Sequence, residues 1–512
     1  MNTLSKELMS DHKVLAKREQ FRDRYWRDKD PIAEDRLLWR AQTFRHLVHL
    51  LPGQTILELG CGQGRLTRKL VQVSRGENPI TAVTFQEDGE ILQSPGLESV
   101  EFLPYALTPE RLEGREFDFI IAMDLLDKEN CSWMLRQAYQ LLKPGGEIVF
   151  YESNPWNPVL QLNRAVARAA GSTDCRRLLS KPRLYELMSE VGLVRAFAVF
   201  TDFAYAPLTR YGSWLLQNLS VLLENMPYVR VFAGAILIHA QKPSHGVTLS
   251  PDVSLCEHEQ LRRTVSVVVP CHNEEMNVRP LVSRLLALYG DYLHEIVLVD
   301  DNSRDNTAQV IRQLAAEHPL IKPVFRTPPN GVGLAIRDGY AAATGRYVLS
   351  MDCDFQHLLP ELRDIFDAAT AGYDVVIGSR FSRRSVLLNY PFQKILANRG
   401  FHLLARLILP VKFRDVTNNL KLIRREVLNE LELTQSGFAI NAETGLLPLV
   451  AGYSCKEVPI SWINRTPEMG VSSFKLAQVG TGYWRVLSRL WLKRVSRKKP
   501  VATTVTLPSP AC

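Results

Sequence analysis

Short apolar runs separated by longer amphipathic stretches recur along two parts of the chain. In the first part, residues 55–60, 80–85, 117–123 and 146–152 read TILELG, ITAVTF, FDFIIAM and GEIVFYE, and AGAILIHAQ follows near Lys242. Apolar runs of this length between helical patterns are typical of buried parallel strands in an α/β sheet. We therefore predict a doubly wound α/β domain over residues 1–243.

This alternation of apolar and amphipathic runs stops after residue 243 and resumes at residue 263. Residues 244–262 are mostly polar and follow Pro243, with a second proline at 251 and a glycine at 246, which indicates a linker. From residue 263 to 478 the runs TVSVVVP, HEIVLVDD, RYVLSMDCD and YDVVIGSR predict a second doubly wound α/β domain. Before the first strand, Asp35 is a candidate N-cap for an amphipathic helix that ends near Pro52.

The C-terminal residues 479–512 carry a different pattern. The segment GTGYWRVLSRLWLKRVSRKK places Trp484, Leu487, Trp491 and Val495 among arginines and lysines. A basic helix with aromatic residues on one face is typical of binding to an anionic membrane surface, although a solvated helix packed on the domain has the same pattern. The residues after Lys499 are expected to be disordered.

Composition and charge narrow the class of protein. The 512 residues are 46% hydrophobic and 23% charged, as in ordinary globular proteins, and the net charge is +8. The eight cysteines form no CxxC pair, which predicts a reduced, cytoplasmic location, and the charged first twenty residues are not expected to act as a signal peptide. The excess basic residues cluster near the C-terminus, so nucleic acid is not expected as a partner.

A glycine-rich turn follows the first strand. The sequence LELGCGQG brings glycines at 60, 62 and 64 to the carboxyl end of a strand, where the backbone can approach a ligand at a helix N-terminus. Together with FDFIIAMDLLD and LLKPGGEIVFYESNP, in that order, it resembles the class I S-adenosylmethionine-dependent methyltransferases over residues 35–242. This resemblance implies a Rossmann-like fold. It also implies a cofactor site formed by Glu58, Gly60, Cys61, Gly62, Gly64, Thr84 and Asp124.

The resemblance departs from the family at the cofactor ribose. The family usually ends its second strand with an acid, whereas this chain has Thr84 there, and Glu87 is the nearest acid that could reach back. No residue pattern in this part of the sequence identifies the methyl acceptor. An alternative is therefore that the first domain is a binding module without catalytic activity.

In the second domain, three apolar strands are each followed by acidic residues. SVVVP leads into Cys271-His272-Asn273-Glu274, EIVLV into Asp300-Asp301, and RYVLSM into Asp352-Cys353-Asp354-Phe355-Gln356. The carboxyl ends of parallel strands form binding crevices. Hard oxygen ligands there could hold a divalent cation that neutralises a departing nucleotide diphosphate. Asp352, Asp354 and Gln356 are the candidate ligands of Mg²⁺ or Mn²⁺.

Seven motifs in order resemble the family 2 glycosyltransferases of GT-A fold, and within them the dolichol/polyprenyl-phosphate mannosyltransferases. They are VVVPCHNEEMNV, LVDDNSRDNT, GVGLAIRDGYAAATG, MDCDFQH, VVIGSRF, DVTNNLKLIRREVL and EVPISWINR, over residues 264–476. The resemblance implies a nucleotide-sugar site and catalytic roles for Asp352, Asp354 and Arg380. The site would be lined by Pro270, His272, Glu274, Val299, Asp301, Cys353, Arg465 and Lys475.

The acceptor has two candidate classes. A polyprenyl phosphate is already ionised and needs no strong general base, whereas a hydroxyl of a glycan, lipid or metabolite does. Asp415 and Glu443 are the candidate bases for a hydroxyl. The chain has DVTNN where the family usually has a DLTGS-like segment, which could change the acceptor geometry. The expected protein is a bifunctional transferase, peripheral on a membrane or aided by a membrane partner subunit.

Overall fold

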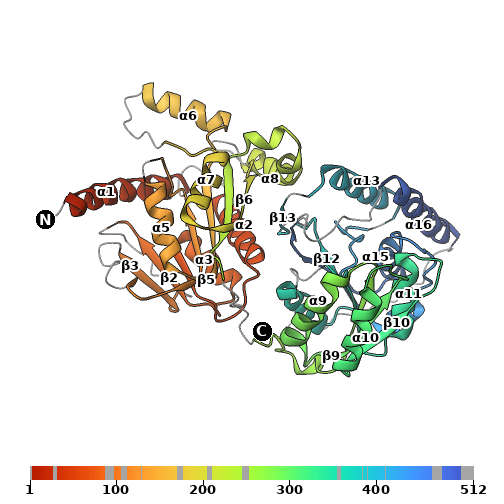
Figure 1. Ribbon diagram of the computed structural model, residues 1–512. Coiled ribbons are helices and arrows are strands. Elements are labelled where there is room, and N and C mark those ends of the chain that lie inside the picture. Colours follow the sequence, from red (N-terminus) through yellow and green to blue (C-terminus); the bar gives the residue numbers. More distant parts are fainter. Residues whose placement is uncertain are drawn as a thin grey trace, which may run out of the picture.

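The protein was analysed as a computed structural model. The structure describes residues 3–26, 32–86, 97–104, 112–128, 130–169, 177–203, 210–244, 253–354, 359–382, 384–388, 390–409, 411–463 and 476–496. Within these ranges the chain forms two α/β domains that lie side by side (Figure 1).

The first domain is built on a seven-stranded sheet of order β3-β2-β1-β4-β5-β7-β6. Its strands are β1 (Ile56–Leu59), β2 (Ile80–Thr84), β3 (Val100–Pro104), β4 (Phe117–Met123), β5 (Leu142–Ser153), β6 (Val194–Thr201) and β7 (Ala235–Gln241). Its helices are α1 (Thr3–Arg24), α2 (Ala33–Leu47), α3 (Arg65–Val73), α5 (Cys131–Leu141), α6 (Pro158–Ala169), α7 (Lys181–Val191), α8 (Arg210–Asn225) and the 3-10 turn η3 (Val229–Phe232). Only β7 runs antiparallel to its neighbours.

The burial of the central strands explains this arrangement. Every residue of β1, β2 and β4 is buried, as expected for strands covered by helices on both faces. Since β1 pairs in parallel with both β2 and β4, the carboxyl ends of all three strands meet at one edge of the sheet. That edge carries the glycine-rich turn after Leu59.

The second domain also has a seven-stranded sheet, of order β10-β9-β8-β11-β14-β12-β15. Its strands are β8 (Val265–Cys271), β9 (Leu293–Asp300), β10 (Ile321–Phe325), β11 (Tyr347–Ser350), β12 (Val375–Ser379), β14 (Lys421–Arg424) and β15 (Cys455–Pro459). A small two-stranded sheet pairs β13 (Leu387–Leu388) with β16 (Trp462–Ile463). Strand β14 is antiparallel to β11 and β12, whereas β8, β9 and β11 are parallel.

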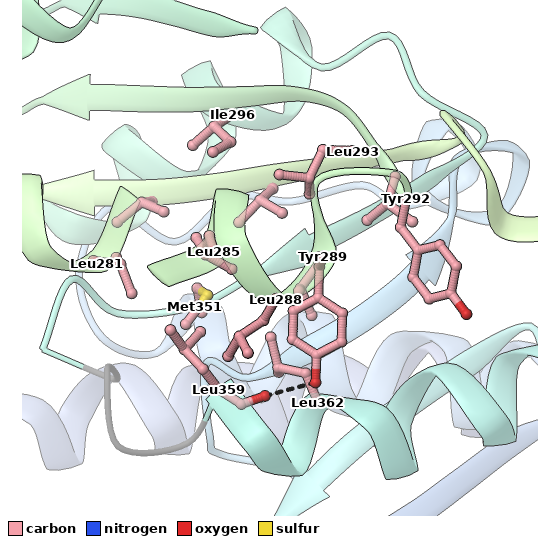
Figure 2. Packing of buried hydrophobic residues seen from close by; sticks show 14 of the residues in the cluster. Leu281, Leu285, Leu288, Tyr289, Tyr292, Leu293, Ile296, Met351, Leu359 and Leu362 are labelled. Carbon is pink, nitrogen blue, oxygen red and sulfur yellow. Dashed lines mark hydrogen bonds between the residues drawn. The ribbon is translucent and has the colours of Figure 1, made fainter. Parts of the chain in front are cut away.

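Eight helices and a short 3-10 turn are described around the second sheet. They are η4 (Glu259–Leu261), α9 (Glu275–Tyr289), α10 (Thr307–Glu317), α11 (Val332–Ala342), α12 (Leu362–Thr370), α13 (Phe392–Ile408), α14 (Arg425–Glu430), α15 (Ile440–Ala451) and α16 (Leu476–Ser496). One core cluster packs α9 and α12 against the sheet, and Figure 2 shows part of it. In that cluster the Tyr289 hydroxyl donates a hydrogen bond to the Leu359 carbonyl oxygen over 2.7 Å. This contact fixes the chain at the point where it enters α12.

The two domains share buried contacts. Leu51, from the first domain, lies in the core cluster of α9 and α12, and Val386 and Leu388 lie in a core cluster of the first domain. Several charged residues at the start of and along α12 also pair with residues of the first domain. The pairs are Glu361 with His46, Arg363 with Glu77, Asp364 with Arg45 and Arg75, and Asp367 with Arg75. The two domains therefore form one packed unit along α12.

Three sequence expectations need correction or refinement. Helix α2 begins at Ala33, with Ile32 at the N-cap, so the prediction of Asp35 as the N-cap was wrong. Ala33 packs in a core cluster with Leu37, which extends the helix toward its N-terminus. Strands β3 and β6 were not identified from the sequence, and part of the expected linker packs on the second domain through Leu255 and Leu261.

Helix α16 confirms the expected C-terminal helix, but its apolar residues fall into a buried group and an exposed group. Leu487, with Val486 and Leu490, is buried in the core of the second domain, whereas Trp484 and Trp491 remain about half exposed. The aromatic residues and the packed residues thus lie on different faces: the burial of Leu487 agrees with the alternative of a helix packed on the domain, and Trp484 and Trp491 stay exposed.

Candidate active sites

The second domain collects its acidic residues at the carboxyl ends of β8, β9 and β11. Because β8 pairs in parallel with β9 and β11, Cys271, Asp300 and Ser350 end three neighbouring strands. Asp301 directly follows β9, and Asp352 lies two residues after the end of β11. The arrangement predicted from three acid-terminated strands therefore exists as one edge of the sheet.

Asp301 is held by the protein at this edge. Its Oδ2 accepts a hydrogen bond from the Gly331 backbone N–H over 2.7 Å, and its Oδ1 pairs with the Arg326 guanidinium. The Asp301 carbonyl oxygen accepts a hydrogen bond from Asn330 Nδ2 over 2.9 Å and lies 3.0 Å from His272 Nδ1. Asp301 is buried, so these contacts fix the loops on either side of it.

The remaining predicted pocket residues near β8 differ in exposure. Pro270 is half-buried at the end of β8, and His272 is exposed beside it. Glu274 accepts a hydrogen bond from Asn277 Nδ2 over 2.5 Å, and its backbone N–H donates to Thr307 Oγ1. Val299 is fully buried in the core cluster of the second domain. Pro270, His272 and Glu274 can thus face a ligand, whereas Val299 supports the strand from inside.

The carboxylate of Asp352 is positioned by a residue that sequence reasoning did not assign to the metal site. Asn419 Nδ2 donates a hydrogen bond to Asp352 Oδ1 over 2.8 Å, and the Asn419 carbonyl oxygen accepts one from Ser350 Oγ over 2.7 Å. Asp352 is half-buried and Asp354 is buried two residues later. Two carboxylates at a strand end supply the hard oxygen ligands that Mg²⁺ and Mn²⁺ prefer, so these residues fit such an ion. The third predicted ligand, Gln356, lies outside the described residues.

Cys353, between the two carboxylates, is a buried thiol. The Cys353 thiol forms a hydrogen bond with the Cys271 thiol. This bond and burial together raise the pKa of Cys353 well above the ordinary value. Both cysteines are free. Because the Cys353 side chain is buried and neutral, only the backbone of this residue is available to the site.

Arg380 and Asp415, predicted to act on phosphate and as a candidate base, pair with each other. Arg380 Nε lies 2.7 Å and Nη2 3.1 Å from the two oxygens of Asp415, whose side chain is fully buried. Burial raises the pKa of Asp415, but the Arg380 guanidinium outweighs it and holds the pKa far below the ordinary range. Asp415 also accepts hydrogen bonds from the backbone N–H and hydroxyl of Thr417.

Both carboxylate oxygens of Glu443, the other candidate base, also contact groups of the protein. Its Oε2 accepts hydrogen bonds from the backbone N–H groups of Thr434 and Gln435, each over 2.9 Å. Its Oε1 accepts from the Thr434 hydroxyl and pairs with Arg489 of α16 over 2.7 Å. The Glu443 side chain is fully buried, so it links α15, the preceding loop and α16.

A buried lysine lies behind the same edge. Lys421 donates hydrogen bonds from Nζ to the carbonyl oxygens of Asn418 and Asn441. Burial lowers the pKa of Lys421 to about 7, against the favourable field of Asp415. The two predicted phosphate-binding residues Arg465 and Lys475 lie outside the described residues.

The first domain places the predicted cofactor residues around the turn after β1. Gly60, Gly62 and Gly64 all have φ between +55° and +74°, which favours glycine. Glu58 is buried below them and accepts a hydrogen bond from Thr67 Oγ1 over 2.6 Å, while burial raises the pKa of Glu58 to about 7. Cys61 is also buried, which raises the pKa of its thiol. Asp124 Oδ1 accepts hydrogen bonds from the backbone N–H and hydroxyl of Ser153.

Helix α1 lies across this turn and was not expected there. Glu19 Oε1 accepts a hydrogen bond from the Gly62 backbone N–H over 2.7 Å, and Glu19 Oε2 accepts from the Thr84 hydroxyl over 2.9 Å and the Phe85 backbone N–H over 3.0 Å. Arg22 donates to the carbonyl oxygens of Gly60 and Met123, over 2.6 and 3.0 Å. The backbone and Thr84 therefore form a polar cradle at the ends of β1, β2 and β4, which suits an amino acid group and ribose hydroxyls. In this conformation, α1 fills that cradle.

The residues that sequence reasoning missed come from distant segments. Asn419 was noted only as a departure in the DVTNN segment, and Glu19 and Arg22 belong to a polar helix without a motif. An acid was sought near the end of β2, and Glu19 is the acid that reaches Thr84. Chain distance hid this contact, since the two residues are far apart in sequence.

Comparison with known proteins assigns both halves of the chain. Residues 266–432 match the model of glycosyl transferase family 2, and residues 56–146 match a methyltransferase domain model. The dolichol-phosphate mannosyltransferase of Pyrococcus furiosus is 32% identical over 214 residues, which cover 41% of this chain and 59% of that protein. The polyprenol monophosphomannose synthase of Mycolicibacterium smegmatis is 29% identical over 227 residues, which cover 43% of this chain and 84% of that protein. The match thus spans about three fifths of the length of the archaeal relative.

Similarity to solved structures is weaker. Glucosyl-3-phosphoglycerate synthase of Mycobacterium tuberculosis is 19% identical, with a TM-score of 0.36, over 48% of this chain and 86% of that one. This similarity is too low to support an argument about function. Among the described residues, no helix has both the length and the apolar character needed to cross a membrane.

Proposed function

We propose, on the premise that this chain joins a methyltransferase domain to a family 2 glycosyltransferase domain, that it is a bifunctional transferase. One reaction transfers a sugar from a nucleotide sugar, with GDP-mannose or a UDP-sugar as donor, to a polyprenyl phosphate. The other transfers a methyl group from S-adenosylmethionine to an acceptor that remains to be found. The similarity to a dolichol-phosphate mannosyltransferase and to a polyprenol monophosphomannose synthase supports the first reaction.

The donor site is proposed at the carboxyl ends of β8, β9 and β11. Asp352 and Asp354 would hold Mg²⁺ or Mn²⁺, with Gln356 as a third ligand, and the ion would supply Lewis-acid stabilisation of the departing diphosphate. The hydrogen bond from Asn419 to Asp352 supports this role, because it orients one carboxylate toward a defined direction. Pro270, His272, Glu274 and Asp301 would line the nucleotide, and Arg465 and Lys475 would contact phosphates.

The burial of both candidate bases carries the choice of acceptor. A hydroxyl acceptor needs a carboxylate that can take a proton, but the oxygens of Asp415 and Glu443 are engaged by Arg380, Arg489 and several N–H groups in fully buried positions. A phosphate acceptor is already an anion and needs no such group. This observation favours polyprenyl phosphate over a glycan, lipid or metabolite hydroxyl.

Two neighbouring helices offer a surface that supports lipid access. Leu396, Leu403 and Leu407 of α13 are 49–74% exposed, and Trp484, Trp491 and Leu492 of α16 are 48–56% exposed. Phe401 and Tyr483 pack at a ring distance of 5.0 Å, which joins the two helices, seen side by side in Figure 1. Apolar side chains beside Arg399, Arg406 and Arg485 suit the interface of an anionic membrane, so we propose peripheral binding there.

The methyl transfer reaction rests on the cradle at the ends of β1, β2 and β4. Glu58, Gly60, Cys61, Gly62, Gly64, Thr84 and Asp124 would surround S-adenosylmethionine, which supplies an electrophilic methyl group when bound. The alternative is a first domain that binds but does not catalyse. In the conformation described, Glu19 and Arg22 occupy groups of this cradle, so cofactor binding to the full chain is the first step to test.

A donor screen on the full chain tests the glycosyltransferase proposal. GDP-mannose, UDP-glucose and related donors are supplied with Mn²⁺ or Mg²⁺ and a short polyprenyl phosphate, and labelled sugar is counted in the lipid phase. We expect metal-dependent labelling that is lost in Asp352→Asn and kept in a control such as Lys17→Gln, at an exposed residue of α1. Donor hydrolysis without labelled lipid would reject the acceptor and place the hydroxyl alternative first.

A further inference from the structure

The N-terminal helix α1 makes specific polar contacts with the cradle of the first domain. Glu19 is 3% exposed and uses both carboxylate oxygens, one on Gly62 and the other on Thr84 and Phe85. Asp23, one helical turn later, accepts a hydrogen bond from the Gln63 backbone N–H over 3.1 Å. Three acceptor sites on α1 thus occupy the donors of the glycine turn and of the end of β2.

Arg22 complements these acids with positive charge. Its guanidinium donates to the carbonyl oxygens of Gly60, which follows β1, and Met123, which ends β4. Those carbonyl oxygens are the acceptors that an ammonium group would use in this cradle. Burial opposes the charge on Arg22, but the carboxylates of Asp23 and Glu19 outweigh it and raise the pKa of Arg22.

The fit of α1 leaves no room beside the glycine turn. A Cβ atom added to Gly62 would lie 2.2 Å from Asp23 Oδ2, so the helix side chain contacts the backbone of the turn directly. Outside the cradle, α1 is anchored by buried Leu15 and by an ion pair between Arg18 and Asp127. The helix is therefore docked with its charged residues inside the site and with Phe21 67% exposed on its other face.

We propose that α1 is a competitor built into the chain: Glu19, Arg22 and Asp23 take the hydrogen-bonding groups that the amino acid and ribose parts of S-adenosylmethionine need, so the cofactor binds only when this helix withdraws. The inference rests on the proposed cofactor site. A docked and a withdrawn state then exchange, and the apparent affinity for the cofactor is reduced by the fraction of withdrawn molecules. The bond between Arg22 and Gly60 and the bonds to Glu19 are lost together on withdrawal, because one helix carries them.

Calorimetry with S-adenosylmethionine and full-length protein tests this competition. Glu19→Gln with Arg22→Gln removes both charges; the first change keeps the size of the side chain and the second shortens it, so docking weakens and the affinity should rise at least about tenfold. Lys17→Gln is the matched control, since Lys17 is exposed on the same helix, and its affinity should equal that of the unchanged protein. Equal affinity of the double variant and the unchanged protein would overturn the competition and leave the cofactor assignment standing.

Hydrogen exchange of α1 supplies an independent readout. Cofactor added to the unchanged protein should speed amide exchange of residues 14–24, because binding selects the withdrawn state. Slower exchange on cofactor binding would mean that the helix closes over the ligand, and it would overturn the proposal. Absence of binding by the unchanged protein and by the double variant alike would reject the cofactor site, and the competition with it.

Discussion

His46 of α2, in the first domain, lies with its Nδ1 2.8 Å from Oε1 of Glu361, the N-cap residue of α12 in the second domain. Glu361 also accepts a hydrogen bond from the Ser461 backbone N–H over 2.7 Å, and both its oxygens are used because the Ser461 hydroxyl donates to Oε1. Glu361 comes shortly after the segment of the candidate metal ligands, and Ser461 precedes β16. The first domain therefore contacts a buried carboxylate that joins two segments flanking the sugar-transfer site.

Replacement of His46 by alanine should weaken both stability and sugar transfer. His46→Ala removes one polar neighbour of the buried Glu361 carboxylate, and leaving a buried polar group without a partner costs about 1–3 kcal/mol. We expect a lower midpoint of thermal unfolding and a higher KM for the sugar donor, because Ser461 and the start of α12 lose a shared anchor. The measurements are calorimetric unfolding and initial rates of transfer.

The control for this prediction is Gln42→Ala, on the same helix. His46→Gln can still donate to Glu361 and should recover part of the donor KM. If His46→Ala lowers stability but leaves the donor KM unchanged, the contact holds the domains together without positioning the sugar-transfer site.

Replacement of Asn419 by leucine should weaken metal binding without unfolding the protein. The Asp352 carboxylate then loses the 2.8 Å hydrogen bond that orients it, while leucine retains a similar volume. Partners of metal ligands typically change affinity by about 10–100-fold, so the Mn²⁺ concentration at half-maximal transfer should rise at least about tenfold. Titration of Mn²⁺ in the transfer assay measures it, and an unchanged titration would show that Asn419 does not position the ligand.

The pair between Arg380 and Asp415 gives a test of the acceptor. Asp415→Asn leaves the Arg380 guanidinium buried without a counter-charge, which typically costs about 3–5 kcal/mol. We expect unfolding at a clearly lower urea concentration. The rate of sugar transfer per folded molecule should also fall, because Arg380 is no longer held in place. A variant that folds with unchanged stability yet transfers no sugar would instead identify Asp415 as a base and favour a hydroxyl acceptor.

Glu58 makes the stability of the first domain depend on pH. Burial raises the folded-state pKa of Glu58 to about 7, above its ordinary value of 4.5. The folded state thus holds a proton that the unfolded state has released, so the contribution of Glu58 to stability is complete below about pH 4.5 and is lost as pH rises through about 7.

Glu58→Gln should remove this dependence, because glutamine can accept the hydrogen bond from Thr67 without a charge. The variant should unfold at a higher urea concentration than the unchanged protein at about pH 8, and the difference should shrink at about pH 5. Glu113→Gln, at an exposed residue, is the control. An equal difference at both pH values would contradict the buried acid.

Much of the fold could be predicted from local sequence. Runs such as FDFIIAM and SVVVP are apolar on both faces, which suits strands covered on both sides by helices, and they became β4 and β8. The acids after β9 and β11 follow strand ends, and parallel neighbours bring such ends together. The family resemblances in both halves were confirmed by the matches to domain models.

The sequence by itself therefore determined the central strands of the two sheets, the ends of those strands and the acidic and glycine-rich turns, because these depend on residues close together in the chain. Tertiary structure alone decided that Asn419 orients Asp352, that Asp415 is neutralised by Arg380, and that His46 reaches Glu361. It also decided that Glu19 fills the place beside Thr84. The physical reason is that a buried polar group must find its partner wherever packing brings one, and a linear pattern does not specify that partner.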